Sequence, residues 1–284
     1  MNAAPTDKTV LITGTSSGIG LAAAVAAAQA GWHVVATMRD PGRADPLRRA
    51  AAEAGVADRI QLKQLDVVDP ESITACLAEV IAEHGRLDAL VNNAGAGKVG
   101  TVELHGTQIF REAMEVNFFG VVEVTRAALP HLRASGGRIL TVTSVGGVVG
   151  QPFNEAYCAA KFAVEGFMES LAPVAETLGV SVSVIEPGAV ATEFVSSLGL
   201  DIPVLLAQAG PYAPALRSYL DHVMGAFGSA QTPAEAAAPI IEALAAERPA
   251  FRIQTSDWAR QFTGTKLADN DGYSVVALTS EWVR

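Results

Sequence analysis

The chain has 284 residues, enough for one large α/β domain or two small ones, and half of them are hydrophobic. Its net charge of −10 argues against nucleic acid or an anionic membrane as the main partner. The two cysteines lie far apart, the five histidines form no metal-binding motif, and no apolar stretch is long enough to cross a bilayer, so we expect a soluble cytoplasmic protein without a metal ion.

Short apolar segments alternate with helical segments along most of the chain. Strands are expected at 9–13, 32–38, 59–65, 87–91, 138–143 and 180–186. Helices are expected at 19–30, 42–54, 70–84, 108–133 and 156–178. Asp69 is a suitable N-cap for the third helix, and Pro173 is expected to disturb the last one. The alternation predicts a single domain of the α/β class with a doubly wound, Rossmann-type parallel sheet between two helical layers.

Two later regions lack this alternation. Residues 189–230 form an excursion that is rich in apolar side chains and broken by prolines. We expect this excursion to cover the site, and its apolar side chains either line a pocket or form the internal core of a helical lid. A tail follows from about residue 250 to residue 284, and it either packs on the edge of the sheet or touches a neighbouring subunit.

Glycines between the first strand and the first helix predict a dinucleotide-binding loop, Thr13-Gly-Thr-Ser-Ser-Gly-Ile-Gly20. Gly14 permits the tight turn, Gly18 lets the backbone approach a pyrophosphate, and Gly20 lets the helix pack on the strand. The helix N-terminus then faces the anion. The candidate cofactor-binding residues of this loop are Gly14, Ser16, Ser17, Gly18, Ile19 and Gly20.

Two other glycine patterns are set aside. Gly95-Ala-Gly-Lys-Val-Gly100 matches the usual dinucleotide fingerprint letter by letter, but no helix is expected to open there until about ten residues later. Gly14-Thr-Ser-Ser-Gly18 matches the nucleophile turn of hydrolases. That chemistry needs an acid and then a histidine later in the chain, and nothing around His222 indicates such a pair.

Acid–base chemistry is indicated by Tyr157 and Lys161, which are four residues apart in an expected helix, and by Ser144 upstream at a strand end. The spacing places both side chains on one helix face. A phenol with a pKa of about 10 is too weak an acid at neutral pH, and an adjacent ammonium lowers that pKa. Ser144 can donate a hydrogen bond to a carbonyl oxygen. The pair alone is more often an ordinary amphipathic face, and the other motifs give it weight.

Taken in order, these motifs resemble the short-chain dehydrogenase/reductase family over about residues 8–195. The markers are Thr13-Gly-x-x-x-Gly-x-Gly20, Asn92-Asn-Ala-Gly95, Asn117, Ser144, Tyr157-x-x-x-Lys161, Pro187-Gly188 and Thr192. Residues 144–153 and 157–166 resemble the hydroxysteroid and retinol dehydrogenase branch of this family.

The resemblance implies a role for each matching residue. Tyr157 would be the general acid in reduction and the base in oxidation, and Lys161 would bind the nicotinamide ribose and lower the pKa of the tyrosine. Ser144 would hold the substrate carbonyl, and Asn117 would hold a water that relays protons. The other cofactor-binding residues would be Asn93, Ala94 and Gly95 on the adenosine side, Asp66 and Val67 at the adenine, and Pro187, Gly188, Val190 and Thr192 around the nicotinamide. Taken singly, Asn117 and Thr192 are also suitable capping residues, and Asp66 a strand end.

The residues after the second strand favour NADP(H) over NAD(H). Enzymes that use NAD commonly place an acid there for the ribose hydroxyls, whereas this chain has Met38 at that place and Arg39 next to it. A guanidinium suits a 2′-phosphate in charge and in geometry. The alternative is that Arg39 is a solvated loop charge and that Asp40 binds the ribose of NAD(H).

The sequence therefore predicts an NADP(H)-dependent oxidoreductase that moves hydride between nicotinamide and a carbonyl or secondary alcohol. The apolar excursion favours a lipophilic substrate, and the resemblance implies steroid- or retinoid-like chemistry and a homodimer or homotetramer built on the helices at 108–133 and 156–178. Two alternatives stay open. One is a non-catalytic NADP(H)-binding sensor or scaffold, and the other is a sugar-nucleotide epimerase or dehydratase, which usually carries a different glycine spacing and a larger C-terminal domain.

Overall fold

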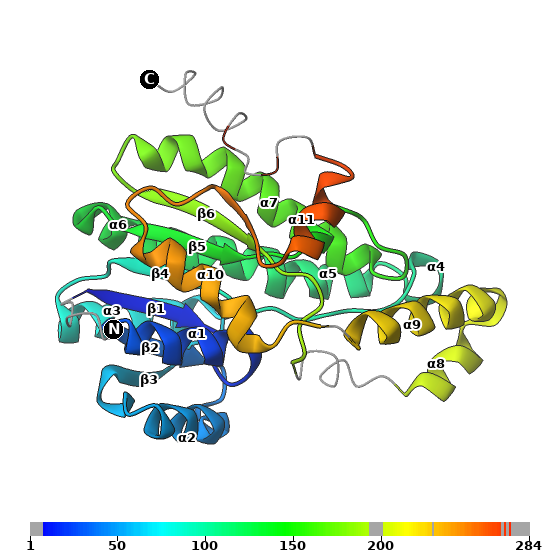
Figure 1. Cartoon of the computed structure of the whole chain (residues 1–284), viewed down its shortest axis with the longest axis horizontal. Coiled ribbons are helices and arrows are strands. Elements are labelled where there is room, and N and C mark those ends of the chain that lie inside the picture. The colour runs from blue at the N-terminus through cyan, green and yellow to red at the C-terminus, as the bar shows by residue number, and fades with distance from the viewer. Residues whose placement is uncertain (1–7, 193–200, 229, 268–269, 271–272, 274–284) are drawn as a thin grey trace.

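Seven parallel strands form one sheet at the centre of the computed structural model, which describes residues 8–192, 201–228, 230–267, 270 and 273 (Figure 1). The strands are β1 (Thr9–Thr13), β2 (His33–Met38), β3 (Ile60–Gln64), β4 (Ala89–Asn92), β5 (Arg138–Val142), β6 (Ser181–Glu186) and β7 (Arg252–Gln254). Their order across the sheet is β3-β2-β1-β4-β5-β6-β7. The chain therefore winds outward in one direction from β1 and in the other from β4, which confirms the doubly wound fold.

Alternate side chains of each strand enter two different cores. In β1, for example, Val10 and Ile12 enter one core and Leu11 enters the other. The first core is closed by α1 (Gly18–Gln29), α2 (Asp45–Glu53) and α10 (Pro233–Ala245), and the second by α3 (Pro70–His84), α6 (Gly120–Ser135) and α7 (Glu155–Glu176). Because both faces of the sheet are covered, the five inner strands are buried along nearly their whole length, whereas the edge strands β3 and β7 are only partly buried.

Capping residues set the beginnings of two of these helices. The Asp69 carboxylate accepts hydrogen bonds from the backbone N–H groups at the start of α3, and Pro70 occupies the first position, as the sequence predicts. Helix α10, which is not among the predicted helices, begins with a capping box between Thr232 and Glu235. Helix α7 continues through Pro173 and ends three residues later, so the expected disturbance is limited to its last turn.

The predicted helix at 108–133 consists of three consecutive segments. Helix α5 (Gln108–Met114) is followed by a π-helical turn, η3 (Glu115–Phe119), and then by α6. Wide turns of this kind occur frequently at functional sites. The turn contains Asn117, which is fully buried.

The beginning of the C-terminal tail adds the last strand to the sheet. Strand β7 pairs with β6 in parallel, with Ile253 opposite Ile185. Helix α11 (Asp257–Gly264) follows, and the ring of Trp258 packs over Gly188, where an added Cβ would lie 2.9 Å from two ring atoms. Residues 252–264 thus take the first of the two arrangements considered, packing on the sheet edge.

The described part of the excursion consists of α8 (Ile202–Gln208), the turn η6 (Gly210–Tyr212) and α9 (Ala213–Phe227), which project to one side of the sheet (Figure 1). A parallel bridge between Val190 and Gln231 joins the two ends of the excursion at its base. The apolar residues Phe194, Val195, Leu198 and Leu200 lie outside the described residues. Among the described helices, none has both the length and the hydrophobicity that a membrane span requires.

Candidate active site

The predicted site residues gather at the carboxyl edge of the sheet. Gly14 follows β1, Asn93 follows β4, Ser144 follows β5 and Pro187 follows β6. Parallel strands end at the same edge, where doubly wound sheets bind their ligands. The fold therefore brings together segments that are far apart in the sequence.

The glycine loop between β1 and α1 requires glycine at particular positions. Gly14 and Gly18 have φ values of 71° and 58°, in the left-handed region that glycine adopts without strain. A Cβ on Gly20 would lie only 2.3 Å from the Gly14 carbonyl oxygen and from the Asn93 amide nitrogen. Ser17 precedes α1 but its hydroxyl does not cap the helix. The N-terminal N–H groups of α1 thus remain available to an anion, as predicted for a pyrophosphate.

Thr13 and Asn93 hold this glycine loop against the loop that follows β4. The Thr13 hydroxyl oxygen accepts hydrogen bonds of 3.0 Å from the backbone N–H groups of Asn93 and Ala94. The Asn93 amide donates to the carbonyl oxygens of Thr13 and Gly14 at 2.9 and 3.0 Å. Asn93 therefore shapes the loop through its side chain, and the motif alone does not indicate this role for Thr13.

Ser144, Tyr157 and Lys161 lie together beside this loop. The Ser144 hydroxyl is hydrogen-bonded to the Tyr157 phenol and also accepts a 3.0 Å hydrogen bond from the Gly146 backbone N–H. The Lys161 Nζ donates to the Val142 carbonyl oxygen at 3.0 Å and lies 5.9 Å from the centre of the Tyr157 ring. The predicted hydroxyl, phenol and amine are therefore neighbours.

Asn117 joins the π-helical turn to the loop after β4. Its amide nitrogen donates to the carbonyl oxygens of Ala96 and Ala113 at 2.9 and 3.0 Å, and its amide oxygen accepts from the Ala96 N–H at 3.1 Å. A Cβ on Gly95 would lie 2.9 Å from the Asn117 oxygen and 3.6 Å from the Lys161 Nζ. Asn117 thus belongs to the same cluster, where its side chain binds backbone groups.

Burial shifts the pKa values of both ionisable groups toward their neutral forms. Burial raises the pKa of Tyr157 to about 12, although the hydrogen bond with Ser144 acts in the opposite direction. Burial lowers the pKa of Lys161 to about 8, and the nearby Glu165 carboxylate opposes that change. The pKa of Tyr157 therefore stands above its ordinary value in this structure, because burial of the phenol outweighs the hydrogen bond that lowers it.

The residues after β2 differ in burial and in the hydrogen bonds that their side chains form. Met38 is buried, whereas Arg39 is exposed and its side chain forms no hydrogen bond or ion pair within the described part of the chain. Asp40 accepts a 2.9 Å hydrogen bond from the Gly42 backbone N–H and caps the short helix η1 (Pro41–Arg43). The Arg39 guanidinium is therefore accessible at this edge, whereas the Asp40 carboxylate is already hydrogen-bonded to the Gly42 N–H.

Asp66 and Val67 follow β3 and complete the predicted adenine side. The Asp66 carboxylate accepts a 3.2 Å hydrogen bond from the Val68 N–H, so it stabilises the turn that leaves the strand. Val67 packs against the start of α6, where a Cβ on Gly120 would lie 2.9 Å from it. Both residues thus have structural contacts of their own.

The loop after β6 lies close to the catalytic cluster and to the glycine loop. The Pro187 carbonyl oxygen accepts a 2.9 Å hydrogen bond from the Val145 N–H, next to Ser144. Thr192 approaches the glycine loop, because a Cβ on Gly18 would lie 3.1 Å from its methyl group. The loop after β6 therefore contacts both the segment at Ser144 and the start of α1.

A family model described as short chain dehydrogenase matches residues 8–202, more than half of the chain. The chain belongs to the short-chain dehydrogenase/reductase family. It is therefore an oxidoreductase of a family that acts on alcohol and ketone substrates.

Relatives match almost the whole chain. Human retinol dehydrogenase 8 is 38% identical over 98% of this chain and 90% of its own length. Human 17-beta-hydroxysteroid dehydrogenase type 1 is 39% identical over 94% of this chain and 83% of its own length. A solved short-chain dehydrogenase from Streptomyces avermitilis is 34% identical to this chain and superposes on it with a TM-score of 0.76. The match covers 98% of this chain and 97% of the solved one. These similarities confirm the predicted resemblance to the hydroxysteroid and retinol dehydrogenase branch.

In this short-chain dehydrogenase/reductase, the excursion is anchored next to the start of α7, the helix that carries Tyr157 and Lys161. The Tyr219 hydroxyl on α9 is hydrogen-bonded to the side-chain amide of Asn154, which immediately precedes α7. The Tyr219 ring also packs on Phe153, with ring centres 5.6 Å apart. Phe153 has a φ of 56°, a conformation that costs energy for a bulky residue and often marks a functional site. The sequence motifs indicate neither Asn154 nor Tyr219.

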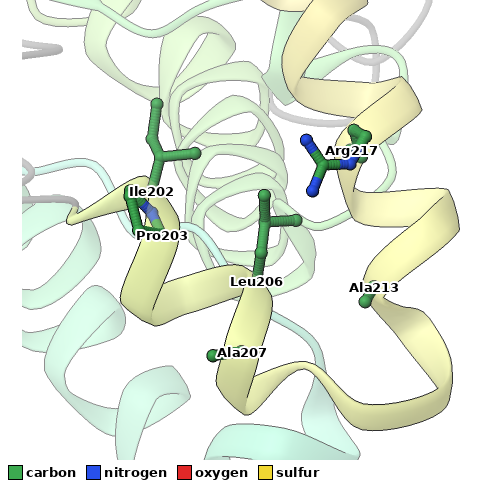
Figure 2. Close-up of a pocket in the computed structure, with 6 residues that line it drawn as sticks. All are labelled: Ile202, Pro203, Leu206, Ala207, Ala213 and Arg217. Atoms are coloured by element: carbon green, nitrogen blue, oxygen red, sulfur yellow. The ribbon is translucent and has the colours of Figure 1, made fainter.

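Some apolar side chains of the excursion form an internal core, and others line a groove, so both predicted arrangements occur. Leu216 and Leu220 are buried in a small core with Phe153. On the other side, a groove of about 470 Å³ lies between α8 and α9, with Arg217 directed toward α8 (Figure 2). The groove is lined by Ile202, Pro203, Leu206, Ala207, Ala213 and Arg217. The helical lid thus has its own core and also exposes an apolar groove.

Proposed function

We propose that this oxidoreductase uses NADP(H) to interconvert a lipophilic ketone or aldehyde and the corresponding alcohol. The nicotinamide supplies or accepts the hydride, and Tyr157 donates or accepts the proton at the substrate oxygen. The observation that carries the proposal is the cluster of Ser144, Tyr157 and Lys161 at the same sheet edge as the glycine loop. Proton donor and hydride carrier then meet at one carbon–oxygen bond.

The protonation state of Tyr157 supports a role as proton donor. With a pKa of about 12, the phenol stays protonated through neutral pH, the form that carbonyl reduction needs, and the proposed role requires the Lys161 ammonium to lower that pKa during proton transfer. Ser144, already hydrogen-bonded to the phenol, is placed to bind the same substrate oxygen and to stabilise the charge that develops there. Lys161 is placed to bind the ribose hydroxyls and to favour the phenolate that remains after proton transfer.

The choice of NADP(H) rests on the residues after β2. Arg39 offers an exposed guanidinium, which pairs well with a 2′-phosphate. Met38 is buried and apolar, and Asp40 caps η1 instead of presenting a free carboxylate to a ribose. Ser16 and Ser17, on the adjoining loop, can add hydroxyl contacts to the same phosphate.

The proposed substrate class rests on the lid and on the relatives. The lid combines an apolar core with an apolar groove, which suits a lipophilic molecule. The relatives named above are dehydrogenases of retinol and of 17-beta-hydroxysteroids, and we propose a steroid-, retinoid- or other ketone-like substrate. A non-catalytic sensor is disfavoured because the whole acid–base cluster is in place.

We also propose a cytoplasmic homodimer or homotetramer. Phe119 on η3 and Val174 on α7 are large apolar residues that are each 47% exposed, and we propose that a second copy covers them. Both cysteines are free and buried, which suits a reducing compartment. Light scattering in solution measures the oligomeric state, and a stable monomer would contradict this part of the proposal.

The test is a panel of steroid, retinoid and simple ketones and alcohols, each assayed with both nicotinamides. We expect turnover of at least one lipophilic substrate, with kcat/KM at least about tenfold higher with NADP(H) than with NAD(H). Tight NADPH binding without turnover of any substrate would favour the sensor instead. Equal use of both nicotinamides would contradict the cofactor assignment alone.

A further inference from the structure

The lid, formed by α8, η6 and α9, contacts the segment that leads into α7. The side-chain amide of Asn154, the residue before α7, donates hydrogen bonds to the Tyr219 hydroxyl on α9 and to the Pro152 carbonyl oxygen. Asparagine is among the residues that best cap a helix, yet the Asn154 side chain makes no capping hydrogen bond to α7. The amide therefore binds the lid instead of the helix that it precedes.

Phe153 brings three segments together at the same point. Its ring packs on the Tyr219 ring, with centres 5.6 Å apart, and is buried in the core of the lid. Its carbonyl oxygen accepts a 2.7 Å hydrogen bond from the Gly100 N–H, in the loop after β4. With a φ of 56°, Phe153 has a backbone conformation that a bulky residue keeps only where its surroundings hold it. The lid, the loop after β4 and the entry to α7 thus meet at two adjacent residues.

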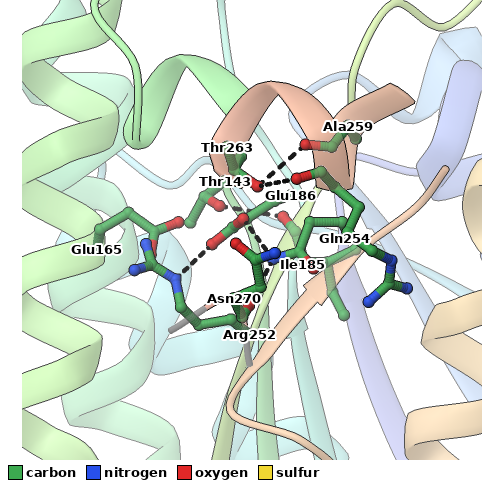
Figure 3. A network of polar contacts seen from close by, with 10 residues as sticks. Thr143, Glu165, Ile185, Glu186, Arg252, Gln254, Ala259, Thr263 and Asn270 are labelled. Atoms are coloured by element: carbon green, nitrogen blue, oxygen red, sulfur yellow. Dashed lines mark hydrogen bonds and ion pairs between the residues drawn. The ribbon is translucent and has the colours of Figure 1, made fainter. Parts of the chain in front are cut away.

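The same segment leads directly to Tyr157. The Asn154 carbonyl oxygen accepts a 2.8 Å hydrogen bond from the Cys158 N–H, so Asn154 and Tyr157 lie within one helical turn. About two turns beyond Tyr157, Glu165 is bound by Arg252, whose Nη2 lies 2.9 Å from Glu165 Oε2 (Figure 3). Helix α7 is therefore anchored on both sides of Tyr157, by the lid at its beginning and by the C-terminal strand in its middle.

We propose that Tyr219 is a positioning residue, which holds the lid closed against the entry to α7 and thereby shapes the substrate side of the active site. The inference rests on the proposed function, in which a lipophilic substrate binds between the lid and Tyr157. Tyr219 acts through Asn154 and Phe153 and takes no part in proton or hydride transfer. It lies beyond residues 8–202, the part of the chain that the family model matches.

A second tyrosine of the lid provides a matched comparison. The Tyr212 hydroxyl, on η6, is hydrogen-bonded to the Glu103 carboxylate on α4 (Val102–His105), and this contact is exposed. Within the described part of the lid, Tyr212 and Tyr219 are the two side chains that hydrogen-bond to residues outside it. Both hydroxyls therefore tie the lid to the rest of the protein, but the contact of Tyr219 is the one that reaches α7.

Trypsin reports directly on the lid, because Arg217 on α9 is the only lysine or arginine between Lys161 and Arg248. Cleavage inside a helix requires local opening, and its rate follows the population of the open form. We expect Tyr219→Phe, which removes one hydroxyl, to accelerate cleavage at Arg217 by about three- to tenfold, as for the loss of one hydrogen bond. Tyr212→Phe is expected to change the rate by less than about twofold, because water replaces its exposed partner.

Cleavage after Arg111, on α5, controls in the same digest for opening of the rest of the fold. Asn154→Ala removes the partner of Tyr219, so it is expected to accelerate cleavage at Arg217 to a similar extent, and its combination with Tyr219→Phe no further. Additive effects of the two changes, an unchanged rate in Tyr219→Phe, or equal acceleration in Tyr212→Phe would overturn the inference. The digests need neither cofactor nor substrate, so they are independent of the proposed function.

Steady-state kinetics test the positioning role itself. At saturating NADPH, Tyr219→Phe is expected to raise KM for a lipophilic substrate by at least about fivefold and to leave kcat within about twofold, because the lid closes less often while Tyr157 keeps its contacts. The Kd for NADPH is expected to stay unchanged, since Thr13 and Asn93 hold the glycine loop. Turnover with an unchanged KM would overturn this inference and leave the proposed function intact. A lack of turnover in the unaltered protein would contradict the proposed function, and the digests would still decide whether Tyr219 holds the lid.

Discussion

At Tyr157, burial and hydrogen bonding oppose each other, and burial is the larger effect. The phenol is removed from water, which raises its pKa to about 12, while the Ser144 hydroxyl returns only part of the lost stabilisation of the phenolate. Each pKa unit corresponds to about 1.4 kcal/mol of preference for the neutral form. At neutral pH the phenol is therefore protonated, as its proposed role in carbonyl reduction requires.

Arg39 provides a residue-scale prediction about the cofactor. Replacing it in Arg39→Ala removes the exposed guanidinium proposed to pair with the 2′-phosphate, so the preference for NADP(H) is expected to fall by about tenfold or more. The measurement is kcat/KM with both nicotinamides. Arg43→Ala is the control, since Arg43 is also exposed and lies four residues away on η1. An unchanged cofactor preference in Arg39→Ala would mean that Asp40 or the loop between β1 and α1, and not Arg39, determines which nicotinamide binds.

At the scale of the element, the loop between β1 and α1 depends on contacts that only glycine permits. The Gly20 Cα faces the Gly14 carbonyl oxygen and the Asn93 amide, and Thr13 ties the same loop to β4. The loop is thus held by contacts from the ends of two strands.

Gly20→Ala tests this element. The added Cβ would lie 2.3 Å from a backbone oxygen, so the loop must shift away from α1. We expect the Kd for NADPH, measured by fluorescence titration, to rise by at least about tenfold. Gly225→Ala on α9 is the control, because nothing lies within 4 Å of its added Cβ. Affinity that survives Gly20→Ala would show that the loop does not hold the pyrophosphate.

An element can be predicted from the sequence when residues close together in the chain determine it, and not when contacts with distant segments do. Strands β1, β2, β4, β5 and β6 are largely apolar and β3 has apolar residues at alternate positions, so the sequence predicts all six. Tyr157 and Lys161 share a helix face by spacing alone, so the sequence predicts their proximity as well. Strand β7 has three residues, too few for a period, and its contacts are with distant segments: it pairs with β6, and Arg252 binds Glu165 and Glu186. The contact between Asn154 and Tyr219 joins distant segments in the same way. Helix α10 does carry a readable signal, Thr232-Pro-Ala-Glu235.

For the whole molecule, the C-terminal segment joins the sheet, the lid and helix α7. Arg252 binds α7 and β6, while Thr255 exchanges hydrogen bonds of 2.6 and 2.7 Å with Gln231 at the base of the lid. Removing the charge of Arg252 would leave two buried carboxylates facing each other without a cation.

Arg252→Met is therefore expected to destabilise the fold by about 3–5 kcal/mol, the usual cost of leaving a buried ion pair with one partner missing. Urea denaturation measures the loss. Arg260→Met, at an exposed position on α11, is expected to change the free energy of unfolding by less than about 0.5 kcal/mol. Similar values for the two variants would mean that the buried charges are not coupled.

The most direct test of the central claim is the rate of hydride transfer by Tyr157→Phe on the best substrate of the panel. The change removes only the hydroxyl, so NADPH binding is expected to persist while kcat/KM falls by at least about a hundredfold. A phenylalanine variant that keeps most of the activity would contradict the assignment of Tyr157 as the proton donor.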